Sequence, residues 1–485
     1  MRLGPEPGTS GAISQPVKRA GTRARAKGGL RSQIVRALRH RNFQLFFSGQ
    51  LISLVGTWMQ AVAQSWLVYR LTGSTVALGT VGFAAQIPVF ILAPIGGAVA
   101  DRYGRRRILV GTQSAAMLLA FVLAGLTLSG LVQVWHIYVL AALLGIVNAV
   151  DIPVRQAFIA DMVGKEDLMN AIALNSSMFN GARIIGPAIA GLLVASIGEG
   201  WCFFANAVSY SAVIIGLLCM EIPRHARGVR TASAVAEIIE GFRFVQRTSP
   251  VRALLLLLGV VSLMGMPFAV LMPIVADRIL HRGASALGLL MGASGIGALA
   301  GALSLAARQG VRGLGRWVAL SSAAFGASLI LFSLSRSFWL SAALLVPTGF
   351  ALMVQMAASN TLVQAMVPDA LRGRVMAVYS MMFMGMAPFG ALLAGVLADH
   401  FGAPTTIGMG GSVCIVAAIA FGARLPILRH EARRIIVALQ LAGGDPNDEV
   451  TAQPTLISRT GPERDGPATR DAKSFSPQPV RARPD

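Results

Sequence analysis

The chain has 485 residues, of which 54% are hydrophobic and 13% are charged, and its formal net charge is +21. A soluble domain carries about 25% charged residues, so this composition excludes an ordinary soluble protein. Apolar runs recur that are long enough to cross a bilayer core of roughly 30 Å. They do not alternate with period two, so the sequence predicts an all-α membrane protein.

The predicted elements begin with a disordered basic tail, residues 1–41, and end with a polar, Pro-rich tail, 429–485. Two six-helix bundles, 42–220 and 251–428, flank a cytoplasmic linker at 221–250. The expected helices cover 43–69, 74–100, 108–129, 134–160, 168–196, 201–220, 251–279, 284–307, 315–334, 338–366, 371–399 and 404–427.

Basic residues gather on one set of alternating loops. Of 42 Lys and Arg residues, ten lie in 1–41, four in 97–107 and nine from Arg429 onward. This positive-inside bias predicts that both termini are cytoplasmic, and it favours topology over nucleic-acid binding as the origin of the charge. The N-terminal tail is expected to contact anionic lipids.

Chemistry-bearing clusters are not evident. The three cysteines fall in apolar segments and the six histidines are scattered, so we expect no metal and no cofactor. There is no nucleotide-binding loop of the kind that drives ATP-powered pumps. The N-terminus has no apolar core after its basic residues, so a cleavable signal peptide is not expected. No nucleophile is paired with a base, which argues against a membrane enzyme.

The two bundles echo each other at an offset of 204 residues. Met162-Val163 matches Met366-Val367, and four glycines match in the same register: Gly181 with Gly385, Gly186 with Gly390, Gly191 with Gly395, and Gly198 with Gly402. Parallel repeats of this kind build one class of secondary transporters, with the substrate site near the membrane midplane.

The loop between helices 2 and 3 reads Gly97-Ala-Val-Ala-Asp101-Arg102-Tyr-Gly104-Arg105-Arg106-Arg107. This run resembles the signature G-x-x-x-D-R-x-G-R-R of the major facilitator superfamily. The resemblance implies a latch that holds the two bundles together on the cytoplasmic side, with Asp161 as a partner of its arginines. The competing interpretation is a plain positive-inside anchor. The corresponding loop, 308–316, lacks the carboxylate, so the latch would be one-sided. Its predicted residues are Gly97, Asp101, Arg102, Gly104, Arg105, Arg106 and Asp161.

Helix 5 carries a glycine-proline pattern: Gly181, Gly186, Pro187 and Gly191. Proline removes a backbone hydrogen bond and glycines allow close helix packing. The pattern resembles the Gly-Pro antiporter motif of exporters, although its spacing differs, and this resemblance implies export. Helix packing alone is the alternative.

Three charges are predicted inside the membrane: Asp151, Arg155 and Arg183. An unpaired charge at mid-membrane costs about 2.5–3.5 kcal/mol, so such residues are usually paired or face water. Asp151 and Arg155 share a helix face and could form a fixed ion pair. The alternative makes Asp151 a protonatable coupling site, with Arg183 shaping its affinity. Arg155 could also be plain topology.

Polar residues on several helices are candidates for a central cavity, although hydrogen bonds between helices are a competing role. They are Gln60, Gln64, Gln86, Asn148, Asn175, Gln355 and Asn360. Eight methionines in 353–386 could adapt to varied ligands, but packing or lipid contact explains most of them.

The stretch from Asp151 to Gly191 is similar to the enterobactin-exporter-type branch of the superfamily. This resemblance implies a monomeric transporter of a bacterial inner membrane that exports a small amphipathic molecule by alternating access, in exchange for protons. Two alternatives stay open: uptake or flipping of a lipid-like substrate, and a transport-inactive scaffold or sensor.

Overall fold

A computed structural model describes residues 4, 36–221, 234–308 and 310–441, with the backbone alone at 93–102, 165, 234–237 and 440–441. These residues form helices and contain no strand. Twelve of the helices described there are long and apolar enough to cross a membrane, which confirms the predicted fold. Large apolar side chains such as Leu320, Trp339 and Ile419 point outward, as expected of a surface that faces lipid.

The first bundle follows a short 3-10 turn at Arg36–Arg39. Its fourth and fifth spans form one continuous element, α5, which bends at Gly164 because this glycine has φ 69° and ψ 179°. Positive φ is easily adopted by glycine alone. The helices are α2 (Arg41–Thr72), α3 (Thr75–Arg102), α4 (Arg105–Leu128), α5 (Val134–Ile197) and α6 (Glu199–Leu218).

The linker contains helix α7 (Ala234–Arg247), and the second bundle starts directly after it. Its first span is irregular, because Pro267 and Pro273 interrupt the α-helical ladder. This span runs through α8 (Ser249–Val260), a π turn at Val261–Gly265, a 3-10 turn at Met266–Leu271, α9 (Met272–Ile274) and a second π turn at Val275–Ile279. The others are α10 (Gly283–Ala306), α11 (Leu314–Leu334), α12 (Phe338–Ala365), α13 (Asp369–Met384), α14 (Met386–Phe401) and α15 (Ala403–Leu441).

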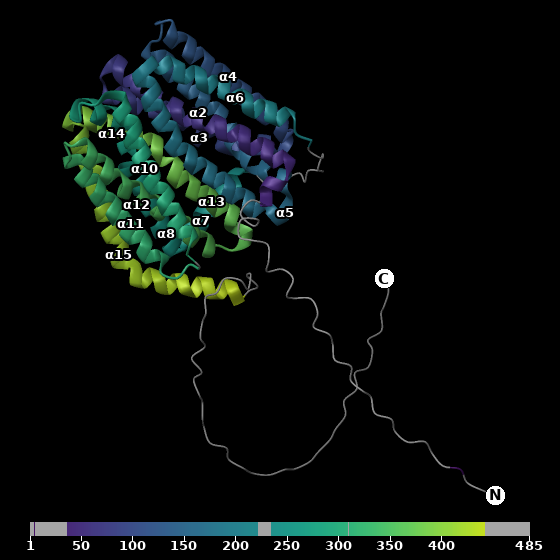
Figure 1. Cartoon of the computed structure of the whole chain (residues 1–485). Coiled ribbons are helices and arrows are strands. Elements are labelled where there is room, and N and C mark those ends of the chain that lie inside the picture. The colour runs from purple at the N-terminus through teal and green to yellow at the C-terminus, as the bar shows by residue number, and fades with distance from the viewer. Residues whose placement is uncertain (1–3, 5–35, 222–233, 309, 442–485) are drawn as a thin grey trace, which may run out of the picture.

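The two bundles lie side by side, the first in purple and blue and the second in green and yellow (Figure 1). They meet along a seam at which α5 packs against α10 and α3 packs against α14. Glycines bring the backbones close there: a Cβ added to Gly288 would lie 2.4 Å from the Pro187 carbonyl oxygen. The seam is therefore a close helix–helix contact of the small-residue type.

The bundle boundaries differ from the predicted ones at both ends. Helix α15 continues through residues 429–441, which the sequence analysis assigned to the C-terminal tail. The extension is amphipathic: Leu428, Ala432 and Ile436 pack on the hydrophobic core while arginines face out. At the other end, Ala37 is buried inside the predicted N-terminal tail. The remainder of both tails and residues 222–233 of the linker lie outside the described residues.

Candidate functional site

A buried carboxylate, Asp151, lies in the middle of a polar network in the first bundle. Its side chain is 3% exposed. One carboxylate oxygen accepts hydrogen bonds from Thr112 Oγ1 at 2.7 Å and Gln113 Nε2 at 2.9 Å. The other oxygen lies 3.2 Å from a guanidinium nitrogen of Arg155, four residues along the helix. Asp151 is thus stabilised as a carboxylate by one cation and two neutral donors.

The side chain of Arg155 is 25% exposed, so it links the buried carboxylate of Asp151 to the surface of the bundle. The pair with Asp151 is the fixed ion pair that the sequence analysis considered. Arg183 is not among the partners of the carboxylate, so a direct effect of Arg183 on Asp151 has no contact to support it.

Arg183 lies instead at the seam between the bundles. Its guanidinium is 5.8 Å from the ring centroid of Trp58 on α2, and Trp58 meets Phe179 edge-on at 5.6 Å. Its backbone oxygen approaches Gly295 of α10 in the other bundle. Within the described residues, no carboxylate forms an ion pair with Arg183. Arg183 is half-buried as a residue, and in the described part of the chain its guanidinium lies beside an aromatic ring rather than a carboxylate.

The residues of the helix-5 glycine-proline motif lie in three different environments. Gly186 packs against α2, where an added Cβ would lie 2.6 Å from Trp58 Cβ. Pro187 and Gly191 form the seam with Gly288 of α10. Gly181 has no atom within 4 Å of its Cβ position. Two glycines of the motif thus have packing roles, one within a bundle and one between bundles.

The predicted latch is only partly described, since the side chains of Gly97, Asp101 and Arg102 lie outside the described residues. Gly104 is the N-cap residue of α4. Arg105 donates to both carboxylate oxygens of Asp161 at 2.8 and 2.9 Å, and Arg106 donates to the Leu218 carbonyl oxygen at 2.6 Å. These described contacts hold helices of the first bundle to one another.

The polar cavity candidates have different surroundings. Gln60 accepts a 2.6 Å hydrogen bond from Asn206, and Asn360 accepts one from Gln364. Gln355 is fully buried, and neither polar atom of its side chain has a partner within the described part of the chain. The other four, Gln64, Gln86, Asn148 and Asn175, are half-buried. The buried position of Gln60 is thus explained by a hydrogen bond between two helices. The side-chain amide of Gln355 lacks a hydrogen-bond partner among the described residues, and water or a ligand could supply one.

Hydrogen bonds between the bundles cluster at the end opposite the linker, which we call the far face. Tyr69 donates its hydroxyl to Asp277 at 2.7 Å, and Arg278 donates to the Gly73 carbonyl oxygen at 3.0 Å. Thr75 donates to Asp399 at 3.4 Å. The Arg278 guanidinium also lies 5.7 Å from the Tyr69 ring. These contacts form a clamp across the seam.

At the linker end, by contrast, the ion pairs among described residues join parts of the same bundle or a bundle and the linker, and the side chains of 93–102 lie outside the description. Arg105 pairs with Asp161 inside the first bundle, and Arg374 pairs with Glu240 of linker helix α7. Within the described part of the chain, the polar side-chain contacts seen across the seam therefore lie at the far face.

Residues 33–448 match the transmembrane secretion effector family of the major facilitator superfamily. The chain belongs to this family. This transmembrane secretion effector is 29% identical over 390 residues to the staphyloferrin A transporter of Staphylococcus aureus, covering 78% of the chain and 95% of the relative. It is 27% identical to the multidrug efflux pump Tap of Mycolicibacterium fortuitum, with 75% and 90% covered. It is 26% identical to the enterobactin exporter EntS of Escherichia coli O139:H28, with 74% and 85% covered.

Solved structures share the fold of this secretion effector. The nucleoside transporter NupG has a TM-score of 0.64 at 13% identity, covering 80% of the chain and 98% of NupG. A bacterial homolog of the lysosomal transporter Spinster, in an inward-facing and unoccupied conformation, has a TM-score of 0.61 at 15% identity, with 84% and 99% covered. The secretion effector is a multi-pass membrane protein and a secondary transporter rather than an enzyme.

Several residues of the site are absent from the sequence-based prediction. Thr112 and Gln113 complete the Asp151 network, Trp58 covers Arg183, and Tyr69 and Asp277 form the clamp. The partners come from helices that are distant in sequence, so no local spacing marks them. The described residues also contain no group of three His, Cys, Asp or Glu side chains placed to bind a metal.

Proposed function

We propose that this secretion effector exports a small, anionic amphipathic molecule across the bacterial plasma membrane by alternating access, in exchange for protons. In this proposal the linker end faces the cytoplasm, as do both termini. The basic loops at that end support this orientation through the positive-inside rule.

The position of the clamp supports an inward-open state. Tyr69–Asp277 and Arg278–Gly73 bind the bundles together at the far face, and the described ion pairs at the linker end lie within a bundle or join a bundle to linker helix α7. For an export cycle this is the state that loads substrate from the cytoplasm. Outward opening then requires the clamp to break and the linker end to close.

The Asp151 network is the single observation that carries the coupling. An ionisable carboxylate inside a membrane helix is costly unless it is satisfied, and Asp151 is satisfied by Arg155, Thr112 and Gln113. A proton on Asp151 removes its negative charge and weakens the pair with Arg155. Because Arg155 is partly exposed, its side chain can then turn toward solvent. The network would thus have two arrangements: Arg155 paired with ionised Asp151, and Arg155 turned away from protonated Asp151.

The surroundings of Arg183 support an anionic substrate. This cation has no carboxylate partner among the described residues, and aromatic rings of Trp58 and Phe179 lie beside it. Such a site fits an anion attached to an apolar or aromatic body. The similarity to a staphyloferrin A transporter and an enterobactin exporter favours siderophore-like molecules as this anion.

Inside-out membrane vesicles that contain the full chain test this function, since export appears there as uptake. We expect a carboxylate or catecholate siderophore to accumulate when an inside-acid gradient is imposed, and a protonophore to abolish the accumulation. Ethidium, a cationic amphiphile, should accumulate at least tenfold less.

Two other results would overturn the proposal. Movement of a fluorescent lysophospholipid without siderophore uptake would indicate lipid flipping. Absence of uptake for every probe by folded protein would indicate a scaffold or sensor.

A further inference from the structure

A second site lies far from the seam, at the linker end of the second bundle. A cavity of about 240 Å³ opens between the start of α8, the loop before α11, the end of α12 and the extension of α15. Four arginines line it: Arg312, Arg316, Arg429 and Arg433. A cavity of this volume is large enough for a polar headgroup and too small for a whole lipid, so most of a lipid bound there would lie outside it.

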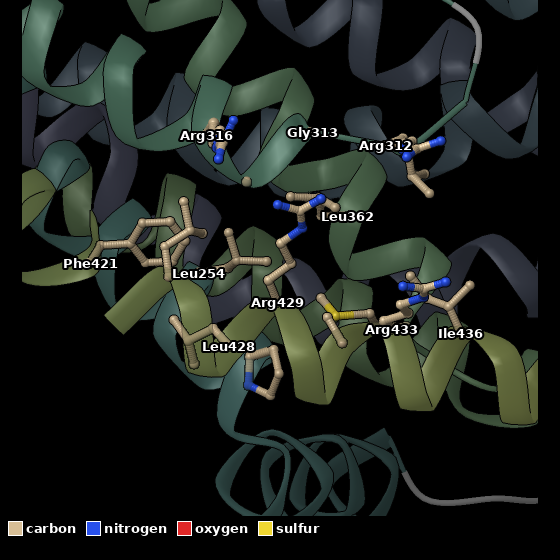
Figure 2. A pocket seen from close by; sticks show the side chains of 16 residues that line it. Leu254, Arg312, Gly313, Arg316, Leu362, Phe421, Leu428, Arg429, Arg433 and Ile436 are labelled. Carbon is tan, nitrogen blue, oxygen red and sulfur yellow. The ribbon is translucent and has the colours of Figure 1, made fainter. Parts of the chain in front are cut away.

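The lining combines basic and apolar side chains, with Leu362 beside Arg429 and Ile436 beside Arg433 (Figure 2). Arg312, Arg316 and Arg429 gather around Gly313 at the loop, and Arg433 lies one turn farther along α15. Leu254, Phe421 and Leu428 also line the cavity. A ligand that fills it must be an anion joined to an apolar chain.

The four arginines lack acidic partners. Within the described residues, none of them forms an ion pair with a carboxylate. Nearby Arg308 adds a further cation, which lies 5.1 Å from the Trp317 ring and donates to the Arg312 carbonyl oxygen. Like charges around one cavity repel each other, so a bound anion stabilises the arrangement.

The position of the cavity matches the headgroup layer of the membrane. Its elements are the ends of spans: α11 begins at Leu314, α12 ends at Ala365 and α8 begins at Ser249. Trp317 is 37% exposed at this level, as is typical of membrane interfaces. Basic pockets between transmembrane helices on this side of a membrane bind anionic lipid headgroups.

We propose that the four-arginine cavity binds an anionic phospholipid, with the phosphate among the arginines and an acyl chain along Leu254 and Phe421. The lipid would fasten the α15 extension to the loop at 311–316. The site is separate from the proposed export path, so its test does not depend on transport.

Native mass spectrometry of the delipidated full chain, titrated with phosphatidylglycerol or phosphatidylcholine, tests this site. We expect phosphatidylglycerol to bind at least tenfold more tightly than phosphatidylcholine. The double variant R429A/R433A should lose at least tenfold in phosphatidylglycerol affinity. R434A removes one positive charge from the same helix outside the cavity, so it should change affinity less than twofold, and the single variant R433A is its charge-matched counterpart inside the cavity. Matching elution on gel filtration checks that each variant is folded.

Four results would overturn the proposal. Equal affinity of R429A/R433A and R434A would mean that the cavity is not the site. Full competition by millimolar glycerol phosphate would indicate a site for a free anion. A tenfold rise in lipid affinity for the full-length variant D445N/D448N/E449Q would indicate that acidic residues after α15 are the natural occupant. In wild-type protein, equal binding of the two lipids would exclude charge recognition without any substitution.

Discussion

The two bundles share a scaffold but differ in the charge that they bury. Gly186 packs α5 onto α2 in the first bundle, and its counterpart Gly390 packs α14 onto Leu263 and Pro267 in the second. Gly191 meets Gly288 across the seam, and its counterpart Gly395 meets Gly79. These two pairs of repeated glycines thus occupy equivalent interfaces, whereas Gly181 has open space at its Cβ position and its counterpart Gly385 is close to Phe90.

The same 204-residue offset relates Asp151 to Gln355 and Arg155 to Ser359. The first pair is ionic and fully hydrogen-bonded, whereas the second is neutral, fully buried and unsatisfied in the described residues. The comparison teaches that the repeat preserves helix packing at these glycines, while the ion pair at this position occurs in the first bundle and not at its counterpart. Coupling is therefore expected in the first bundle, and neutral polar contacts in the second.

The largest expected effects come from glycines of the shared scaffold. A side chain at Gly79 or Gly288 would meet a carbonyl oxygen at 2.6 or 2.4 Å. Overpacking costs about 1–3 kcal/mol, so G79V and G288V should each slow transport about tenfold to hundredfold. The control G125V, where nothing lies within 4 Å, should change the initial vesicle uptake rate less than twofold. If only one of the two variants G79V and G288V slowed transport, the two contacts between the bundles would not be equivalent.

Replacing Arg155 alone tests how the first bundle tolerates its buried charge. Breaking a buried pair costs about 3–5 kcal/mol, and partial exposure of Arg155 reduces this to about 2 kcal/mol. R155A should therefore lower the thermal unfolding midpoint by about 2–4 °C. The graft D151Q/R155S introduces the neutral pair of the second bundle and should recover that midpoint without restoring proton coupling. A graft less stable than R155A would contradict this account.

Arg183 provides a third test, because its counterpart at the 204-residue offset is Ala387. A hydrogen bond to a charged group contributes about 1.5–3 kcal/mol, so R183A should raise the KM for an anionic siderophore at least tenfold. R183K should recover part of this loss, and A387S should leave the KM within twofold. An unchanged KM in R183A would remove Arg183 from the substrate site.

The smallest effect concerns the clamp. Y69F removes one hydrogen bond to Asp277, worth about 1 kcal/mol, and should shift the far face about fivefold toward opening. Hydrogen–deuterium exchange of the segment around Gly73 should quicken accordingly. Y103F, an exposed tyrosine at the linker end, is the control. Equal exchange in Y69F and wild type would mean that the clamp does not hold the far face.

Much of the fold could be predicted from the sequence. Long apolar runs indicate the membrane helices, and the charges of the loops indicate which side of the membrane each loop faces. The bend at Gly164 and the extension of α15 were not predicted from the sequence. The helix α15 continues into a segment in which arginines interrupt the apolar pattern. The Asp151–Arg155 pair followed from helical spacing. The partners Thr112, Trp58 and Asp277 did not, because each comes from another helix and depends on three-dimensional packing.

The central claim is that one proton at Asp151 couples transport in this protein. Proteoliposomes with a trapped pH dye measure it directly, as substrate-dependent proton movement in wild type, D151N and Q355A. We expect proton movement in wild type, at least a third of it in Q355A and none in D151N, although D151N still binds substrate. Proton movement in D151N at the wild-type rate would contradict the account.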